Sequence, residues 1–336
     1  MGRSEKSKPL IVFIISSAFS GSTLLDKTLG NHSSCFSLGE LDKLPAELSS
    51  EKNPCGCTRA LIHCPFWQQV NNHFIRTQGF DFIREPEKLR LMPYPVDNEG
   101  HKKHGGTLQR FLFYLPFLSS GQKNFQQMLS QHGALYEALF QTSEHPVLID
   151  SGKGLLRAVL LKKHLKNYRV RFIHLVRNGM GVLHSSRKTE VYDTLLVEAS
   201  GDLIRQERTR QASPPQEMIR QWKWGNLTSR LILKVFYRKS SFFLRHEDFT
   251  ANPEKELKSV AAFMGIPYEK EWSNLKKNTH HMVNGNASRF FATEIVPSDN
   301  NWEQKLPVTL LQLFRQKAGG TNRFFGYRNT QEHQQN

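Results

Sequence analysis

Short, nearly continuous apolar runs recur along the chain and predict strands that are buried on both faces. The first run is Leu10–Ser16, with the sequence LIVFIIS, and Cys35–Glu40 reads as a short second strand that leads into a loop. Strands that end in loops are predicted within Pro146–Gly154 and Tyr168–Gly179, and a further strand is predicted over Ser240–Phe249.

Between these runs, apolar residues recur at the spacing of amphipathic helices. The predicted helices are Thr23–Leu29, Pro65–Thr77, 107–119, 124–143, Leu155–Asn167, Met180–Lys188, Pro214–Lys239 and Asn252–Gly265. Residues 80–106 are rich in Pro, Gly and His and are predicted to form an irregular loop or lid.

The alternation of strands and helices predicts an α/β fold, with a central parallel sheet flanked by helices. We expect a single domain over residues 1–330 and a polar, disordered tail over 331–336. Ligands of such sheets bind beyond the carboxyl ends of the strands, which here points to the loops after Ile15, Leu148 and Val176.

The charge of the chain narrows the choice of ligand. Its 336 residues carry 46 Lys and Arg against 30 Asp and Glu, a formal net charge of +16. This excess suits a polyanion such as nucleic acid, an acidic membrane surface, a nucleotide or a sulfated product. No helix-turn-helix signature, zinc-finger spacing or aromatic RNA-binding motif supports nucleic acid. The apolar run Leu10–Ile15 is too short for a signal peptide or membrane span, so we expect a cytoplasmic protein without membrane contact.

The four cysteines are Cys35, Cys55, Cys57 and Cys64, too few for a disulfide scaffold. A zinc site would need a fourth ligand, for which His63 and His73 are the nearby candidates. A C-x-C pair with one further cysteine is an imperfect zinc pattern. Ordinary thiols, or one local disulfide, are therefore the favoured interpretation, and no metal is expected.

The segment SSAFSGSTLLD, residues 16–26, joins the first strand to a helix through Ser20, Gly21, Ser22 and Thr23. Such a turn can direct N–H groups and hydroxyls at an anion. It lacks both the G-x-x-x-x-G-K-[ST] and the G-x-G-x-x-G spacing, and no Lys or Arg lies between Lys8 and Lys27. The alternative is a simple helix start capped by Ser22 or Thr23.

A second motif, FIHLVRNGMGVLHSSRK, again runs from a strand into a helix. Arg177 follows the strand and Ser185 lies about two turns along the helix, so the pair can bind a second phosphate. The alternatives are an ion pair of Arg177 with a helix terminus and an exposed hydroxyl at Ser185.

Together these motifs resemble those of the sulfotransferases that use 3'-phosphoadenosine 5'-phosphosulfate (PAPS), closest to the branch with tyrosylprotein and carbohydrate sulfotransferases and bacterial relatives. AFSGSTLL is similar to the family's PRSGTTLL loop, and LVRNGMGVLHS to its LVRDGRA…S block. LRHEDFTANPEKELKSVAAFMGIPYE resembles the RYEDL…FLGI block, with His246 in place of Tyr, and HHMVNGNASRF resembles a late GN..R segment. The resemblance runs from about Leu10 to Arg289.

The resemblance implies roles for particular residues. Ser20, Gly21, Ser22, Thr23 and Leu24 would surround the 5'-phosphosulfate. Arg177, Ser185 and Arg187 would hold the 3'-phosphate, and Arg289 would close over the nucleotide. Phe19 departs from the pattern, because it stands where the family has a basic residue.

Glu40 matches the glutamate that acts as the general base, with Asp42 as a nearby competitor. Lys153 matches a family lysine and can supply the cation that Phe19 cannot. His281 is a further catalytic candidate, although a structural role is the stronger interpretation for a chain with 14 His.

The implied reaction transfers a sulfuryl group from PAPS to a hydroxyl or amine, leaving adenosine 3',5'-bisphosphate (PAP). We expect the acceptor to be a small metabolite or natural product, bound in a pocket shaped by residues 80–145. The alternatives are another phosphate-binding enzyme, such as a kinase, and a basic nucleic-acid-binding protein. The sequence leaves the oligomeric state open.

Overall fold

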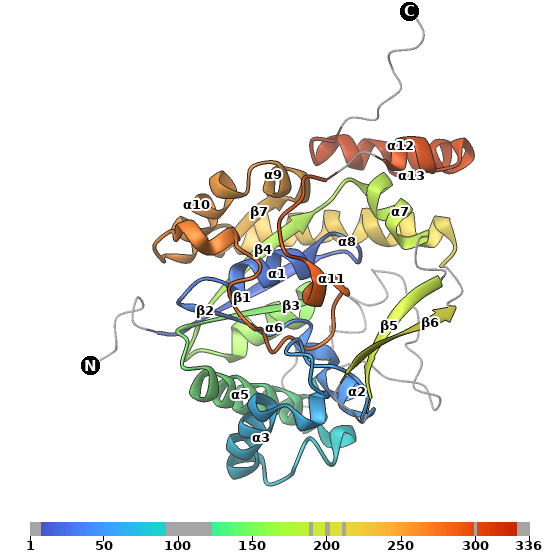
Figure 1. The fold of residues 1–336 in the computed structure, drawn as a ribbon. Helices are drawn as coiled ribbons and strands as arrows, with labels where there is room; N and C mark the ends of the chain where they lie inside the picture. Colours follow the sequence, from blue (N-terminus) through green and yellow to red (C-terminus); the bar gives the residue numbers. More distant parts are fainter. Residues whose placement is uncertain are drawn as a thin grey trace, which may run out of the picture.

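A five-stranded parallel sheet forms the centre of the chain (Figure 1). The computed structural model describes residues 8–91, 123–187, 191–198, 202–209, 213–298 and 301–327. The strands lie in the order β2-β3-β1-β4-β7 and comprise Cys35–Ser37 (β2), Val147–Lys153 (β3), Leu10–Ser16 (β1), Arg169–Val176 (β4) and Ser241–Arg245 (β7). The predicted parallel α/β sheet is therefore confirmed. The last predicted strand was too long, because its second half is helical: helix α9 comprises His246–Ala251.

Strand β1 is buried on both faces, as its continuous apolar sequence predicts. Ile11, Phe13 and Ile15 belong to one hydrophobic core, and the alternating residues Leu10, Val12 and Ile14 to another. The first core includes residues of α3 (Pro65–Gln78), α5 (Lys123–Ser143) and α6 (Leu155–His164), and the second includes residues of α1 (Ser22–Gly30) and α10 (Pro253–Met264). The sheet thus separates two helical layers (Figure 1).

A third core covers the end of β4 and contains Val176, Trp222 and Phe314. It joins α7 (Gly179–Arg187), α8 (Pro215–Phe236) and α13 (Val308–Phe324). The sequence did not predict α13, and it did not predict the antiparallel pair β5 (Val191–Val197) and β6 (Leu203–Thr209), which is separate from the central sheet (Figure 1).

The remaining elements are short. The α-helices are α2 (Leu44–Leu48), α9 (His246–Ala251), α11 (Ser288–Phe291) and α12 (Trp302–Lys305). The 3-10 helices are η2 (Leu41–Lys43), η3 (Leu61–His63), η4 (Pro86–Lys88), η5 (Arg238–Ser240) and η6 (Lys270–Ser273). The predicted helix 107–119, most of the predicted 80–106 loop and the predicted C-terminal tail lie outside the described residues.

The parallel arrangement places the carboxyl ends of the strands at one edge of the sheet, where ligands of such folds bind. The loop after Ser16, Lys153 at the end of β3 and Arg177 after β4 therefore share that edge. Within the described ranges, no helix combines the length and apolar character needed to cross a bilayer.

Candidate active site

The loop between β1 and α1 has the backbone of an anion-binding turn. Gly21 precedes the first residue of α1 with φ 83°, in the left-handed region that favours glycine, and Phe19 also has a positive φ of 62°. In the described part of the chain no side chain caps α1, although both Ser22 and Thr23 were candidate caps. The N-terminal N–H groups of α1 are thus suited to an anionic ligand.

His246 lies directly against this loop. A Cβ atom at Gly21 would lie 2.4 Å from His246 Nδ1, so only glycine fits at this position. The imidazole is buried, and its Nδ1 is among the buried side-chain atoms that have no hydrogen-bond partner in the described part of the chain. Burial, together with the positive charge of Arg177, lowers the pKa of His246 to about 3. The sequence showed His246 as a departure from the family's Tyr but did not reveal this contact.

Arg177 connects the loop to the second motif. Its Nη1 donates to the carbonyl oxygen of Phe19 at 3.1 Å and to Ser185 Oγ at 3.2 Å. The Arg177 carbonyl in turn accepts a hydrogen bond from Trp222 Nε1 at 3.1 Å. The guanidinium is therefore brought to the loop through a backbone contact of Phe19. The Phe19 side chain packs against the third core, and Arg187 is the last residue of α7.

Glu40 and Lys153 form an ion pair on the opposite side of β1. Lys153 pairs with Ile15 in the parallel register and has a positive φ of 59°, so it lies at the start of the anion-binding loop. The exposed fraction is 13% for the Glu40 side chain and 26% for the Lys153 side chain, so a ligand can reach both. The structure therefore brings together the predicted base and the predicted cation, which are far apart in the sequence.

Asp42, the competitor of Glu40, is partly buried. Its Oδ1 is buried and has no hydrogen-bond partner among the described residues. A Cβ at Gly152 would contact Asp42 Oδ1 at 2.7 Å and Arg157 Nη1 at 2.9 Å, so these groups converge below the end of β3. Burial raises the pKa of Asp42, an effect that the charge of Arg157 partly opposes.

The late GN..R segment packs on the start of α1. The backbone N–H of Asn286 donates to Thr23 Oγ1 at 3.1 Å, which holds the segment beside the anion-binding loop. Arg289 Nη2 donates to the Pro54 carbonyl at 3.4 Å, and Nη1 donates to the Gly285 carbonyl. Burial lowers the pKa of Arg289.

His281 lies with three of the cysteines. Its Nδ1 is 3.2 Å from Cys64 Sγ and 3.7 Å from Cys55 Sγ, while Cys57 Sγ is 3.7 Å from Cys64 Sγ. The cysteines are free thiols, so the local disulfide that the sequence allowed is wrong. The fourth member of the cluster is His281 from the other end of the chain. The sequence had pointed to His63 and His73, and His63 is exposed.

Residues 12–305 match the family model of the sulfotransferase domain, which covers most of the chain. The chain therefore belongs to the sulfotransferase family, and the predicted resemblance is confirmed. Its activity is that of a sulfotransferase, the transfer of a sulfuryl group. A search of the curated proteins finds no match.

Several solved structures are similar to this chain. The sulfotransferase domain of the Synechococcus PCC 7002 olefin synthase is 18% identical, with 98% of this chain and 99% of that chain covered and a TM-score of 0.46. The sulfotransferase domain of the curacin biosynthetic pathway is also 18% identical, with 95% of this chain and 98% of that chain covered and a TM-score of 0.47. A sulfotransferase from Alicyclobacillus acidocaldarius is 12% identical, with 98% of each chain covered and a TM-score of 0.40.

Proposed function

We propose that this sulfotransferase takes its sulfuryl group from PAPS and transfers it to a hydroxyl or amine of a small-molecule acceptor, with PAP as the second product. The observation that carries the proposal is the convergence of three groups on one loop. Lys153 lies on one side of the loop, Arg177 lies on the other and the uncapped start of α1 lies between them. A donor that carries phosphates at both ends of a nucleoside matches this distribution of charge.

The 3'-phosphate is assigned to Arg177 and Ser185, with Arg187 as a further cation. The contact of 3.2 Å between Arg177 Nη1 and Ser185 Oγ orients a guanidinium and a hydroxyl toward one another. Such a pair suits a phosphate, because the guanidinium offers several N–H donors in one plane. Residues 20–24 then bind the 5'-phosphosulfate, and Arg289 closes the nucleotide site from the late segment.

The ion pair of Glu40 and Lys153 supplies the two groups that the chemistry requires. In the free enzyme each side chain neutralises the other. A bound phosphosulfate attracts the Lys153 ammonium toward its oxygens, and the Glu40 carboxylate is then available to accept the acceptor's proton. The acceptor oxygen or nitrogen bonds to sulfur in line as the bond from sulfur to the phosphate oxygen breaks, and PAP leaves with that electron pair.

The acceptor pocket is assigned to residues 80–145. Of this range the structure describes residues 80–91 and 123–145, and the second stretch contains helix α5, which lies beside α3 (Figure 1). We infer a small metabolite or natural product as the acceptor, a cytoplasmic location and no nucleic-acid partner. Screening acceptors with PAPS, with mass spectrometry detecting the added sulfonate, tests the acceptor class.

Calorimetry with PAP tests the donor. We expect saturable binding of PAP and much weaker binding of ATP. Arg177→Ala should abolish PAP binding, because it removes the guanidinium N–H groups that would donate to the 3'-phosphate. Arg169→Ala is the matched control, since Arg169 is the first residue of β4, at the opposite end from Arg177, and donates to the Met264 carbonyl. Unchanged PAP affinity in the Arg177 variant, or a preference for ATP, contradicts the proposal.

Glu40→Gln tests the base while keeping the size of the side chain. PAP affinity should be retained, and kcat should fall by about 10²–10⁴-fold because proton removal is lost. Glu47→Gln is the control, because Glu47 is a nearby carboxylate bound by Asn284 Nδ2 at 2.7 Å. If the Glu40 variant keeps full turnover with an acceptor found in the screen, the base lies elsewhere.

A further inference from the structure

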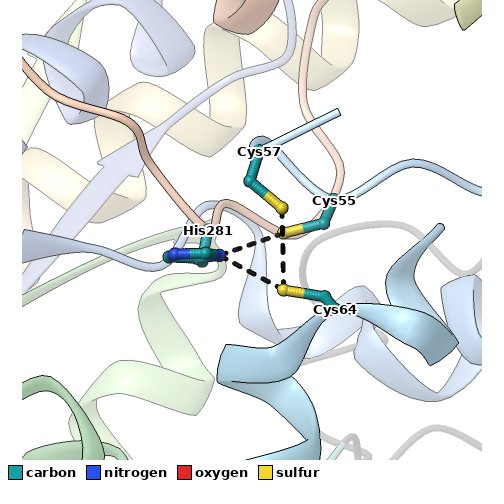
Figure 2. Close-up of side chains that lie close together, drawn as sticks. All are labelled: Cys55, Cys57, Cys64 and His281. Atoms are coloured by element: carbon teal, nitrogen blue, oxygen red, sulfur yellow. Dashed lines mark hydrogen bonds between the residues drawn. The ribbon is translucent and has the colours of Figure 1, made fainter. Parts of the chain in front are cut away.

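A compact cluster of four potential metal ligands lies beside the active site and has no place in the reaction above. It contains Cys55, Cys57, Cys64 and His281, and each pair of their ligand atoms lies within 4.8 Å (Figure 2). Three of the ligands come from the loop before α3, and the fourth comes from the late segment, 217 residues after Cys64. The four side chains point toward a common centre (Figure 2).

The distances fit a tetrahedral zinc ion. Bond lengths of about 2.3 Å to sulfur and about 2.0–2.1 Å to nitrogen place neighbouring ligand atoms about 3.5–3.8 Å apart in a tetrahedron. The measured separations of 3.7 Å for Cys57–Cys64, 3.7 Å for Cys55–His281 and 3.2 Å for Cys64–His281 lie close to that range. A disulfide would need about 2.05 Å between two sulfurs, which is far shorter than the 3.7 Å between Cys57 and Cys64.

We propose that these four residues bind one structural zinc ion through three thiolates and His281 Nδ1. Binding Zn²⁺ releases three thiol protons, so the occupied site carries a net charge of −1. Four protein ligands complete the tetrahedron, which leaves no open position for substrate or water. The assignment replaces the catalytic role that the sequence suggested for His281 with a ligand role.

The surrounding contacts hold the ligands in place before any metal binds. The His281 ring stacks on Phe66, with 4.8 Å between centroids and 16° between planes, and its backbone carbonyl accepts from Trp67 Nε1 at 3.1 Å. The Gly56 N–H donates to the Met282 carbonyl at 3.0 Å, which joins the two segments directly. A Cβ at Gly56 would lie 2.6 Å from the His280 carbonyl oxygen, so a glycine between the first two cysteines allows this approach. Supporting contacts of this kind are typical of metal sites.

The site would fasten a segment that shapes the active site. Two residues after His281, Val283 donates from its N–H to the Leu38 carbonyl and accepts from the Glu40 N–H, both at 2.8 Å. Three residues later, Asn286 donates to Thr23 Oγ1. The zinc ion therefore ties the loop before α3 to the backbone that positions Glu40 and to the start of α1.

Metal analysis of the untagged protein is the first test. We expect about one zinc per chain by mass spectrometry of the metal content. Cobalt(II) added to the chain after chelator treatment should give the strong visible absorption of tetrahedral cobalt and a thiolate charge-transfer band. A chain that contains no metal as purified and takes up neither Zn²⁺ nor Co²⁺ after treatment overturns the proposal.

Variants of His281 test the ligand set. His281→Ala should lower zinc retention strongly, whereas His281→Cys should restore it and strengthen the thiolate-to-cobalt band. His63→Ala is the control, because this exposed histidine lies next to Cys64 yet outside the cluster, and it should keep one zinc per chain. Full zinc retention and an unchanged cobalt spectrum in His281→Ala would overturn the assignment of the fourth ligand. Loss of zinc from His63→Ala would also overturn the assignment of His281 as the fourth ligand.

Hydrogen exchange tests the coupling to the active site without relying on turnover. Removing the metal should speed exchange of the Gly56, Val283 and Glu40 amides, since their bonds join the tied segments. Amides of β4 should be unaffected. Unchanged exchange at the three amides would show that the metal does not fasten this segment. Absence of PAP binding would count against the donor proposal and leave the zinc results intact.

Discussion

Gly21→Ala is the substitution whose cost can be worked out most directly from the structure. The φ of 83° at Gly21 is in the left-handed region, which costs an alanine about 1–2 kcal/mol. The new Cβ would also lie 2.4 Å from Nδ1 and 2.5 Å from Cε1 of His246. His246 is buried, so its ring cannot move aside without disturbing its neighbours, and overpacking of this kind costs about 1–3 kcal/mol. The free energy of unfolding should therefore fall by about 2–5 kcal/mol.

Gly79→Ala provides the matched control. Gly79 ends α3 with φ 75°, nearly the same conformation, but apart from its chain neighbours no heavy atom of the described residues lies within 4 Å of a Cβ built there. The free energy of unfolding of this variant should therefore fall only by the cost of the left-handed backbone conformation, about 1–2 kcal/mol. Urea unfolding of both variants measures the difference, and calorimetry with PAP measures the functional consequence. Gly21→Ala should weaken PAP binding at least tenfold, because the shifted loop misplaces its N–H groups, while Gly79→Ala should bind normally.

Equal destabilisation by the two substitutions would refute this reasoning, because it would mean that the close contact with His246 has no energetic effect. A double-mutant cycle with His246→Ala examines the same point. If the clash is the cause, the loss from Gly21→Ala should shrink once the imidazole is gone, with a coupling of about 1–3 kcal/mol. A coupling near zero would assign the whole effect to the backbone.

Two further predictions concern buried ionisable side chains. Burial raises the pKa of Asp26 from 3.8 to about 7, so the folded chain keeps a proton that the unfolded chain has lost. The free energy of unfolding should therefore fall as pH rises from about 4 to about 7. Urea unfolding across this pH range should show a smaller fall for Asp26→Asn, and an equal fall in the two proteins would contradict the raised pKa of Asp26. Arg157→Met breaks the buried ion pair with Asp150 at 2.9 Å and should cost about 3–5 kcal/mol in the same assay. Lys258→Met, at an exposed pair with Glu254, should cause no measurable change, and similar losses in both variants would argue against burial as the cause.

The sequence was sufficient to predict most of the sheet and the edge that carries the site. Continuous apolar runs such as Leu10–Ser16 predicted the buried parallel strands, because such strands need apolar residues on both faces. Once the strands were parallel, their carboxyl ends had to lie at one edge. Lys153 and Arg177, which follow two of these apolar runs, therefore lie at that edge, whereas the strand order β3-β1-β4, which places them on either side of the loop, was not predicted.

Elements whose stability depends on packing were missed. Helix α13 contains Gly319 and Gly320, which lower its intrinsic helix propensity, so the local pattern gave a weak signal. In the folded chain its Phe314 lies in one core with Trp222 of α8, and this burial favours the helix despite the glycines. The antiparallel pair β5–β6 also went unpredicted, since the stability of each strand depends on contacts with its partner strand, which the local sequence of one strand does not show.

The sequence by itself determined the chemical groups available and the strand ends that carry them. Only the tertiary structure decided which distant groups meet, because local patterns contain no information about contacts between residues far apart in the chain. Arg177, which follows β4, donates to the carbonyl of Phe19 in the loop after β1, a contact between residues 158 positions apart in the chain. In the same way, three cysteines that formed an incomplete zinc pattern in sequence gain their fourth neighbour, His281, when the late segment packs against the loop before α3.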